Sequence, residues 1–286
     1  MAKEKLIEKQ PFKGKKAIVC GASEGIGKAT AKEIVLLGGS VCIIARNLDK
    51  LKAAKEDINS VKVEDSQFVE IISCDATDME KLKPLIEDFI NKKGLPDYLI
   101  NVVGNALPDY LENLTLADFK KHMDVNYYGQ LVPTLILIPH YMKAKKGHIA
   151  FVSSAAAYIG IIGYTMYSPT KAAILGLADS LRNELSPYNI KISIVFPPDT
   201  DTAAFERENI NKPKECFIMS ERGRVLQPEE IAEPFIEGIL KNKFYITPGE
   251  AGFLWWAKRH LTNYVNKATD KELRKARKKL GKDYKY

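Results

Sequence analysis

Short runs of apolar residues alternate with longer amphipathic segments along most of this chain. The apolar runs are rich in Val, Ile and Leu and lack a polar alternation, which is typical of strands covered on both faces. We therefore predict strands over residues 16–20, 40–45, 67–73, 98–103, 148–152, 191–196 and 244–246.

The segments between these runs carry apolar residues at helical spacing and predict helices over residues 25–37, 49–58, 79–92, 116–142, 167–185 and 228–240. Regular alternation of strand and helix predicts an α/β fold, a doubly wound parallel sheet with helices on both faces. The polar residues 200–224 interrupt this rhythm and predict an insertion over the site. With no internal repeat or linker, we predict one domain over residues 15–250, an N-terminal extension over residues 1–14 and a tail over residues 251–286.

Positive charge is concentrated at the C-terminal end of the chain. Residues 258–286 hold 11 Lys and Arg against 3 Asp and Glu, a local charge of +8, whereas the whole chain carries +7. The rest of the chain is therefore near neutral. A basic tail fits an anionic surface of lipid or nucleic acid, and it fits equally a solvated helix. No nucleic-acid-reading module is present, so we predict no nucleic-acid partner.

Four cysteines, Cys20, Cys42, Cys74 and Cys216, occur without a CxxC pair or a Cys/His cluster. This spacing predicts neither disulfides nor a metal site and favours a reducing compartment. The first residues lack the apolar core of a secretory signal, and no run approaches the roughly 20 apolar residues of a membrane span. We therefore expect a body that does not cross a membrane.

A glycine-rich turn, Gly21-Ala22-Ser23-Glu24-Gly25-Ile26-Gly27, follows the first predicted strand and opens the first helix. In this context the backbone approaches a pyrophosphate while the helix N-terminus supplies N–H donors and positive partial charge. The spacing is GxxxGxG rather than GxGxxG. A turn that only packs a helix tightly on a sheet is the alternative. We predict a dinucleotide site contacted by Gly21, Ser23, Glu24, Gly25, Ile26 and Gly27.

The end of the second predicted strand indicates which dinucleotide is bound. Sites for NAD commonly place Asp or Glu here, whereas this chain has Arg46, with Lys50 one turn later. A guanidinium holds a 2′-phosphate by charge-assisted hydrogen bonds, so we predict NADPH and NADP+ as the cofactor; a surface role for Arg46 is the alternative. We expect Asp75 at the adenine edge, and Asn101 and Gly104 beside the ribose and nicotinamide.

Tyr167 and Lys171 are four residues apart in a predicted helix and therefore share one face. A phenol titrates near ~10, and a nearby ammonium favours its ionised form, which eases proton transfer to a carbonyl oxygen. Ser154 ends the fifth predicted strand and can donate to the same oxygen, with Ser153 as the neighbouring alternative. Asn126 is placed to bind a water that links Lys171 to solvent.

With these residues the chain resembles the short-chain dehydrogenase/reductases over residues 15–246. The resemblance implies a Rossmann-type fold, hydride transfer from a nicotinamide, proton donation by Tyr167, and contact of Lys171 with the nicotinamide ribose. It also implies a homo-oligomer, since related folds commonly dimerise through two long helices. The family's catalytic tetrad falls on Asn126, Ser154, Tyr167 and Lys171.

Three short segments depart from the family pattern. Cys20 stands where the family usually has Thr, Asn101-Val102-Val103-Gly104 replaces its Asn-Asn-Ala-Gly, and Pro197-Pro198 replaces its Pro-Gly. The second of these, the replacement of Asn-Asn-Ala-Gly by Asn101-Val102-Val103-Gly104, puts the local packing of that loop in doubt. No member of the tetrad is lost.

The segment after the sixth predicted strand, Pro197-Pro198-Asp199-Thr200-Asp201-Thr202 with Phe205, Glu208 and Lys212-Pro213 beyond it, resembles the 3-ketodihydrosphingosine reductases. That resemblance implies NADPH-dependent reduction of a long-chain sphingoid ketone at the cytosolic face of the endoplasmic reticulum, with Pro197 and Thr202 at the cofactor. A reductase of 3-ketoacyl thioesters or steroids and a non-enzymatic NADP-binding module are the alternatives.

A long-chain substrate makes contact with a membrane an expectation. Residues 252–265 predict a helix whose one face carries Leu254, Ala257, Leu261, Tyr264 and Val265, followed by basic residues. Such a helix lies in a membrane interface rather than spanning it. The same residues fit equally a cap over the substrate pocket or a dimer interface.

Overall fold

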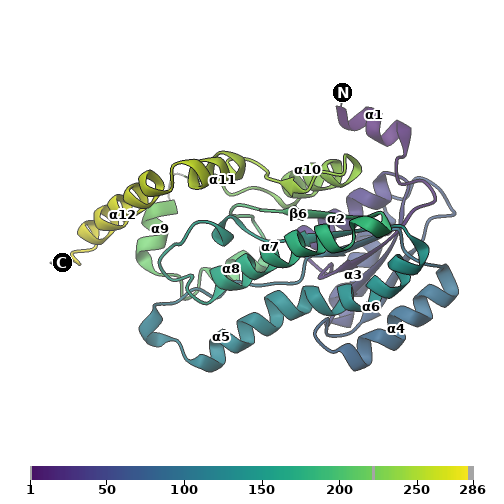
Figure 1. Ribbon diagram of the computed structural model, residues 1–286, viewed down its shortest axis with the longest axis horizontal. Coiled ribbons are helices and arrows are strands. Elements are labelled where there is room, and N and C mark those ends of the chain that lie inside the picture. The colour runs from purple at the N-terminus through teal and green to yellow at the C-terminus, as the bar shows by residue number, and fades with distance from the viewer. Residues whose placement is uncertain (1, 221–222, 283–286) are drawn as a thin grey trace.

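The computed structural model describes residues 2–220 and 223–282 (Figure 1). Three short stretches lie outside this part of the chain: residue 1 of the predicted extension, residues 221–222 of the predicted insertion and residues 283–286 of the predicted tail. Within it, seven strands form one parallel sheet in the order β3-β2-β1-β4-β5-β6-β7. The strands are β1 (Lys16–Cys20), β2 (Ser40–Ala45), β3 (Val69–Ser73), β4 (Tyr98–Asn101), β5 (Gly147–Val152), β6 (Ile190–Val195) and β7 (Tyr245–Ile246).

Helices cover both faces of this sheet, and each face has its own hydrophobic core. On one face lie α2 (Gly25–Leu36), α3 (Leu48–Asn59) and α10 (Pro228–Leu240). On the other lie α4 (Met79–Lys93), α6 (Gly129–Ala144) and α7 (Tyr167–Glu184). Since the strands are buried on both sides, they need the continuous apolar runs seen in the sequence. The predicted doubly wound parallel sheet and single domain are confirmed.

The predicted helix over residues 116–142 is divided into three pieces. It consists of α5 (Leu116–Met123), a π-helical turn η2 (Asp124–Tyr128) and α6. The apolar spacing continues through the turn, so periodicity alone indicates one helix. Short 3-10 turns occur at η1 (Leu111–Asn113), η3 (Ala155–Ala157) and η4 (Ser186–Tyr188).

The two ends of the described chain are helical and lie at different ends of the molecule (Figure 1). The N-terminal α1 (Ala2–Lys9) is joined to the domain by Phe12, which is fully buried with its ring 5.0 Å from that of Tyr98. Near the other end, α11 (Ala251–His260) leads into α12 (Thr262–Lys279), which packs against α9 (Lys214–Ser220). The predicted helix over residues 252–265 thus breaks at Leu261, whose φ and ψ are −128° and 38°. The predicted domain boundaries stay a prediction.

Candidate active site

A cavity of about 1020 Å³ opens at the carboxyl ends of the strands. Its walls come from the loops that follow β1 to β6 and from residues 197–220 and 253–272. This is where ligands bind in open α/β sheets, and the volume is that of a site for a large ligand. The predicted insertion, which contains α8 (Ala203–Glu208) and α9, does lie over this cavity.

The glycine-rich turn forms one wall of the cavity and has no room for side chains. A Cβ on Gly27 would lie 2.1 Å from the carbonyl oxygen of Gly21, and a Cβ on Gly25, where φ is +56°, would lie 3.0 Å from Thr202 Cγ2. Glu24, the N-cap residue of α2, makes no side-chain cap hydrogen bond, and the first turn of α2 holds no acid. The N–H groups of this helix end are therefore left for an anion, which fits a dinucleotide pyrophosphate.

Charged side chains from three segments meet at the end of the cavity next to β2. Lys50 Nζ lies 2.5 Å from Glu24 Oε2, and Arg207 of α8 lies 2.8 Å from Glu24 Oε1. Burial raises the pKa of Glu24, but the hydrogen bonds from Arg207 and Lys50 outweigh it and lower the pKa overall. The exposed Arg46 lies 3.7 Å from Asp75 Oδ2. Three cations thus line this rim, which suits a phosphate group.

Asn101 is the one predicted cofactor residue that the structure places elsewhere. It is fully buried at the end of β4, and its Nδ2 donates to Thr134 Oγ1 of α6 at 3.0 Å. Successive side chains of a strand point to opposite faces, and Asn101 points into the helix layer. Its side chain therefore does not line the cavity, and the predicted contact with the cofactor stays a prediction. All other predicted cofactor residues line the cavity, namely Gly21, Ser23, Glu24, Gly25, Ile26, Gly27, Arg46, Lys50, Asp75, Gly104, Tyr167, Lys171, Pro197 and Thr202.

The two serines that follow β5 have different roles. Ser153 is buried, and its Oγ donates to the backbone carbonyl of Lys171 at 2.8 Å, so it anchors α7 to the sheet. Ser154 lines the cavity, and its side chain acts on the phenol of Tyr167, whose pKa it lowers. Of the two, only Ser154 is placed to share a carbonyl oxygen with Tyr167.

Lys171 lies behind Tyr167, with Nζ 5.7 Å from the centre of the phenol ring. Its Nζ donates to the backbone carbonyl of Val152 at 3.1 Å, and burial lowers its pKa to about 7. Burial also raises the pKa of Tyr167, and the negative charges of Glu208 and Asp199 add to this rise. The expected lowering of the phenol pKa by Lys171 is therefore not seen, because burial dominates. Tyr167 is held as a neutral phenol, the form that donates a proton.

Asn126 lies in the π turn and is fixed by its neighbours. Its Oδ1 accepts from the N–H of Asn105 at 2.7 Å, and its Nδ2 donates to Thr170 Oγ1 at 3.1 Å. A Cβ on Gly104 would lie 2.8 Å from Lys171 Nζ and 3.0 Å from Asn126 Oδ1. The glycine thus lets the backbone pass close to both side chains, where any larger residue would press on them. The bridging water predicted for Asn126 stays a prediction. The catalytic roles of the four tetrad residues stay predictions.

Sequence reasoning missed Gln130, which ties the strand ends together. It is fully buried in α6, and its Nε2 donates to the backbone carbonyls of Val103 at 3.0 Å and Val152 at 2.9 Å. These are the loops that carry Gly104 and Ser154. A polar residue at an otherwise apolar position of a predicted buried helix was the available signal.

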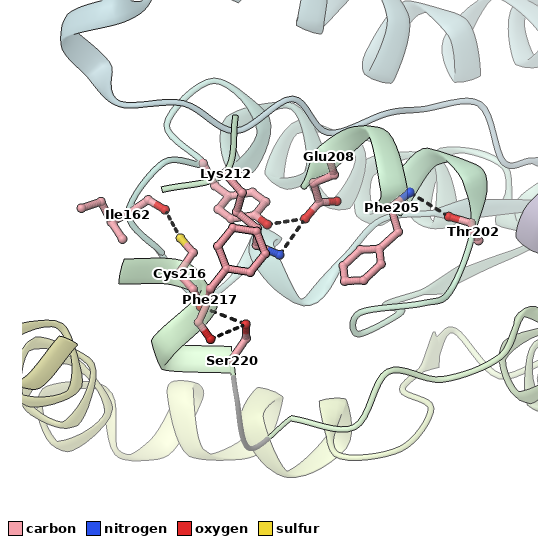
Figure 2. A network of polar contacts seen from close by, with 9 residues as sticks. Ile162, Thr202, Phe205, Glu208, Lys212, Cys216, Phe217 and Ser220 are labelled. Atoms are coloured by element: carbon pink, nitrogen blue, oxygen red, sulfur yellow. Dashed lines mark hydrogen bonds and ion pairs between the residues drawn. The ribbon is translucent and has the colours of Figure 1, made fainter. Parts of the chain in front are cut away.

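The insertion contributes a second missed group, shown in Figure 2. Glu208 at the end of α8 accepts a hydrogen bond from the hydroxyl of Tyr164 and lies 3.3 Å from Lys212 Nζ. All three side chains line the cavity. An acid and a lysine four residues apart were visible in the sequence, but Tyr164 is 44 residues away and carried no signal.

The helices α11 and α12 form the far wall of the cavity. The predicted apolar face, Leu254, Ala257, Leu261, Tyr264 and Val265, lines the cavity, in agreement with the predicted cap. Trp255 fixes α11 to the domain, because its ring lies 4.9 Å from Tyr245 and 5.5 Å from Phe196. Trp256 remains 50% exposed.

The described residues hold neither a membrane-spanning helix nor a cluster of metal ligands. None of the helices in residues 2–220 and 223–282 is long and apolar enough to span a bilayer. In the same residues no group of three or more His, Cys, Asp or Glu side chains is placed to hold a metal ion. All four cysteines are buried and free.

Comparison with known proteins gives consistent matches. The family model described as short chain dehydrogenase matches residues 15–213. A 3-dehydrosphinganine reductase of Danio rerio is 38% identical over 252 residues, which cover 87% of this chain and 76% of that protein. A 3-ketodihydrosphingosine reductase of Bos taurus is 36% identical over the same shares. A crystal structure of a 3-oxoacyl-[acyl-carrier protein] reductase with bound NAD from Brucella melitensis superposes with a TM-score of 0.72 at 22% identity, covering 86% of this chain and 93% of that one.

Proposed function

Because this chain belongs to the short-chain dehydrogenase family of oxidoreductases, we propose that it reduces 3-ketodihydrosphingosine to dihydrosphingosine with NADPH. The observation that carries this proposal is the identity of 36–38% with reductases of this ketone over 87% of the chain. The tetrad and the large cavity supply the chemistry and the space that such a reaction needs.

Tyr167 is the proton donor in the proposed reaction. Its neutral phenol and the Ser154 hydroxyl face the cavity together, so both can donate to one carbonyl oxygen. Once the proton has left Tyr167, the ammonium form of the nearby Lys171 stabilises the phenolate. Return of a proton from solvent to Lys171 through a water bound near Asn126 belongs to this proposal.

A nicotinamide dinucleotide is the cofactor of this enzyme family, and when bound it supplies the hydride that the ketone carbon receives. The glycine-rich turn and the N-terminus of α2 are suited to its pyrophosphate. We favour NADPH because Arg46, Lys50 and Arg207 surround the position expected for the 2′-phosphate. The chain has no acid at the end of β2 to accept from a free ribose hydroxyl.

The alkyl chain of the substrate is proposed to lie along α11 and α12. Leu254, Leu261 and Val265 line the cavity there, and Ile159 and Ile161 line it near the tetrad. Burial of a long alkyl chain against these side chains contributes about 0.8 kcal/mol per methylene. A water-soluble ketone without an alkyl chain would gain no binding energy from these apolar side chains.

The test is a direct comparison of substrates. Purified protein with NADPH is given 3-ketodihydrosphingosine, a 3-ketoacyl thioester and a steroid ketone, and NADPH oxidation is followed with product identification. We expect the sphingoid ketone to have the highest kcat/KM. Rapid turnover of another ketone, with none of the sphingoid ketone, would refute the proposal.

We further propose peripheral contact with the cytosolic face of the endoplasmic reticulum membrane. Phe253 and Trp256 of α11 are 68% and 50% exposed, and basic residues follow them. Aromatic side chains beside cations are suited to an anionic membrane interface. Trp256→Ser should weaken co-sedimentation with anionic vesicles, whereas Leu85→Ser, at an exposed leucine of α4, should not. Equal binding by both variants would contradict this contact.

A homo-oligomer through the long helices stays a proposal, tested by light scattering.

A further inference from the structure

A carboxylate, an ammonium and a phenol are held together in the cavity wall formed by the insertion (Figure 2). The side chains of Lys212 and Glu208 are only 4% and 14% exposed. Tyr164 and Lys212 both contact Oε1 of Glu208. The second oxygen, Oε2, has no hydrogen-bond partner among the described residues. The carboxylate therefore keeps an acceptor to offer.

Aromatic rings fix the position of this group. Lys212 Nζ lies 4.9 Å from the centre of the Phe205 ring, 5.7 Å from that of Phe217 and 5.8 Å from that of Tyr164. Each distance is within the range of a cation–π contact. Lys212 is thereby held on one side of Glu208, and the orientation of the carboxylate is set before a ligand arrives. Fixed charges of this kind recognise a ligand at small cost in conformational entropy.

The group lies next to the reacting end of the cavity. The rings of Tyr164 and Tyr167 are 6.0 Å apart, and the charge of Glu208 acts on the Tyr167 phenol. In an α-amino ketone the nitrogen is bonded to the carbon next to the carbonyl. A substrate whose oxygen meets Tyr167 and Ser154 must therefore bring its nitrogen close to the same place.

We propose that Glu208 is the subsite for the ammonium group of the substrate, with Oε2 accepting its hydrogen bond and Lys212 and Tyr164 holding the carboxylate in position. The subsite deepens the proposed function, on which it rests, because it explains selection of an amino ketone over a ketone without a cation. A 3-ketoacyl thioester or a steroid gains nothing from this carboxylate.

The ammonium also acts on the proton donor. Burial raises the pKa of Tyr167, and the charges of Glu208 and Asp199 raise it further. A cation bound at Glu208 Oε2 opposes the effect of that carboxylate. The amino ketone thus eases the proton transfer on which its own reduction depends.

The experiment compares 3-ketodihydrosphingosine with an analogue that has hydrogen in place of the amino group, with saturating NADPH. Glu208→Gln should lower the ratio of kcat/KM for the two ketones by about 10- to 100-fold, the effect of one hydrogen bond to a charged group. The matched control is Glu206→Gln, at an exposed acid of the same helix, which should keep the native ratio.

A second variant controls for the effect that Lys212 would have if it stayed buried without its carboxylate partner. Glu208→Gln combined with Lys212→Gln removes both charges, and the ratio should fall as in the single variant. The subsite would be overturned if the ratio of kcat/KM for the two ketones stayed unchanged in both variants. It would also be overturned if that ratio fell only in Asp199→Asn. Either outcome would leave the proposed function intact. Failure of the native protein to reduce the amino ketone would overturn the proposed function and the subsite with it.

Discussion

The close approach of Gly27 to Gly21 makes Gly27→Ala a sensitive probe of the cofactor turn. The added methyl group would lie 2.1 Å from the carbonyl oxygen of Gly21 and 2.9 Å from Cα of Ala22. Both neighbours are backbone atoms, so no side chain can rotate to relieve the overlap. Either the turn or the first turn of α2 must move.

The expected loss of stability follows from this geometry. Overpacking of a close-packed site costs about 1–3 kcal/mol, and a clash with backbone belongs at the upper end of that range. At about 2–4 °C per kcal/mol for a domain of this size, a loss of about 3 kcal/mol lowers the melting temperature by about 6–12 °C. Displacement of the α2 N-terminus also removes donors from the pyrophosphate, and loss of one charge-assisted hydrogen bond weakens NADPH binding about 10-fold or more.

The assay is thermal unfolding without cofactor, followed by titration of NADPH. Gly176→Ala is the matched control, because Gly176 lies in α7 with no atom within 4 Å of the added carbon apart from its own helix and neighbours. Alanine there should stabilise the protein by about 0.4–1 kcal/mol. A Gly27→Ala protein that melts with the native one and binds NADPH equally well would refute the close packing of this turn.

Three further changes test the reacting groups and the cofactor. Tyr167→Phe should lower kcat by about 10²- to 10⁴-fold while NADPH binding stays intact, and near-normal turnover would remove the phenol from the mechanism. Arg46→Asp should weaken NADPH by about 100-fold and NADH far less; equal losses in titrations of both would contradict the assignment. The activity kcat/KM should fall as the pH rises through about 7, because burial lowers the pKa of Lys171 to that value and the phenolate then loses its cation. Lys171→Arg keeps its charge and should lose this limb of the profile.

The sheet was predictable because its strands are buried on both faces. The bounds of β1 and β2 agree with the predicted ranges 16–20 and 40–45, where apolar residues stand without interruption. The division of residues 116–142 was not predictable, since α5, the π turn and α6 keep a continuous apolar spacing. The break at Leu261 was likewise not predictable, because α12, which follows it, contacts α9, a helix far away in sequence.

The same distinction holds for the site. Local motifs placed the glycine-rich turn, Tyr167 and Lys171 correctly in the cavity, because a turn or a helix face is set by neighbouring residues. The burial of the Asn101 side chain was not predictable, since the side to which a strand-end residue points depends on the packing of its sheet. The pairing of Glu208 with Tyr164 and of Arg207 with Glu24 joins distant segments, and a single sequence carries no record of such contacts.

The π turn between α5 and α6 holds more backbone than a regular helix needs at that point. Removal of one residue from it would rejoin the two helices and rotate everything that follows by about 100° around the common axis. Gln130 would then swing away from the strand ends that it joins, and Thr134 would leave Asn101. Catalytic alignment in this enzyme is therefore sensitive to the number of residues in that turn, and a deletion there should do more harm than most substitutions.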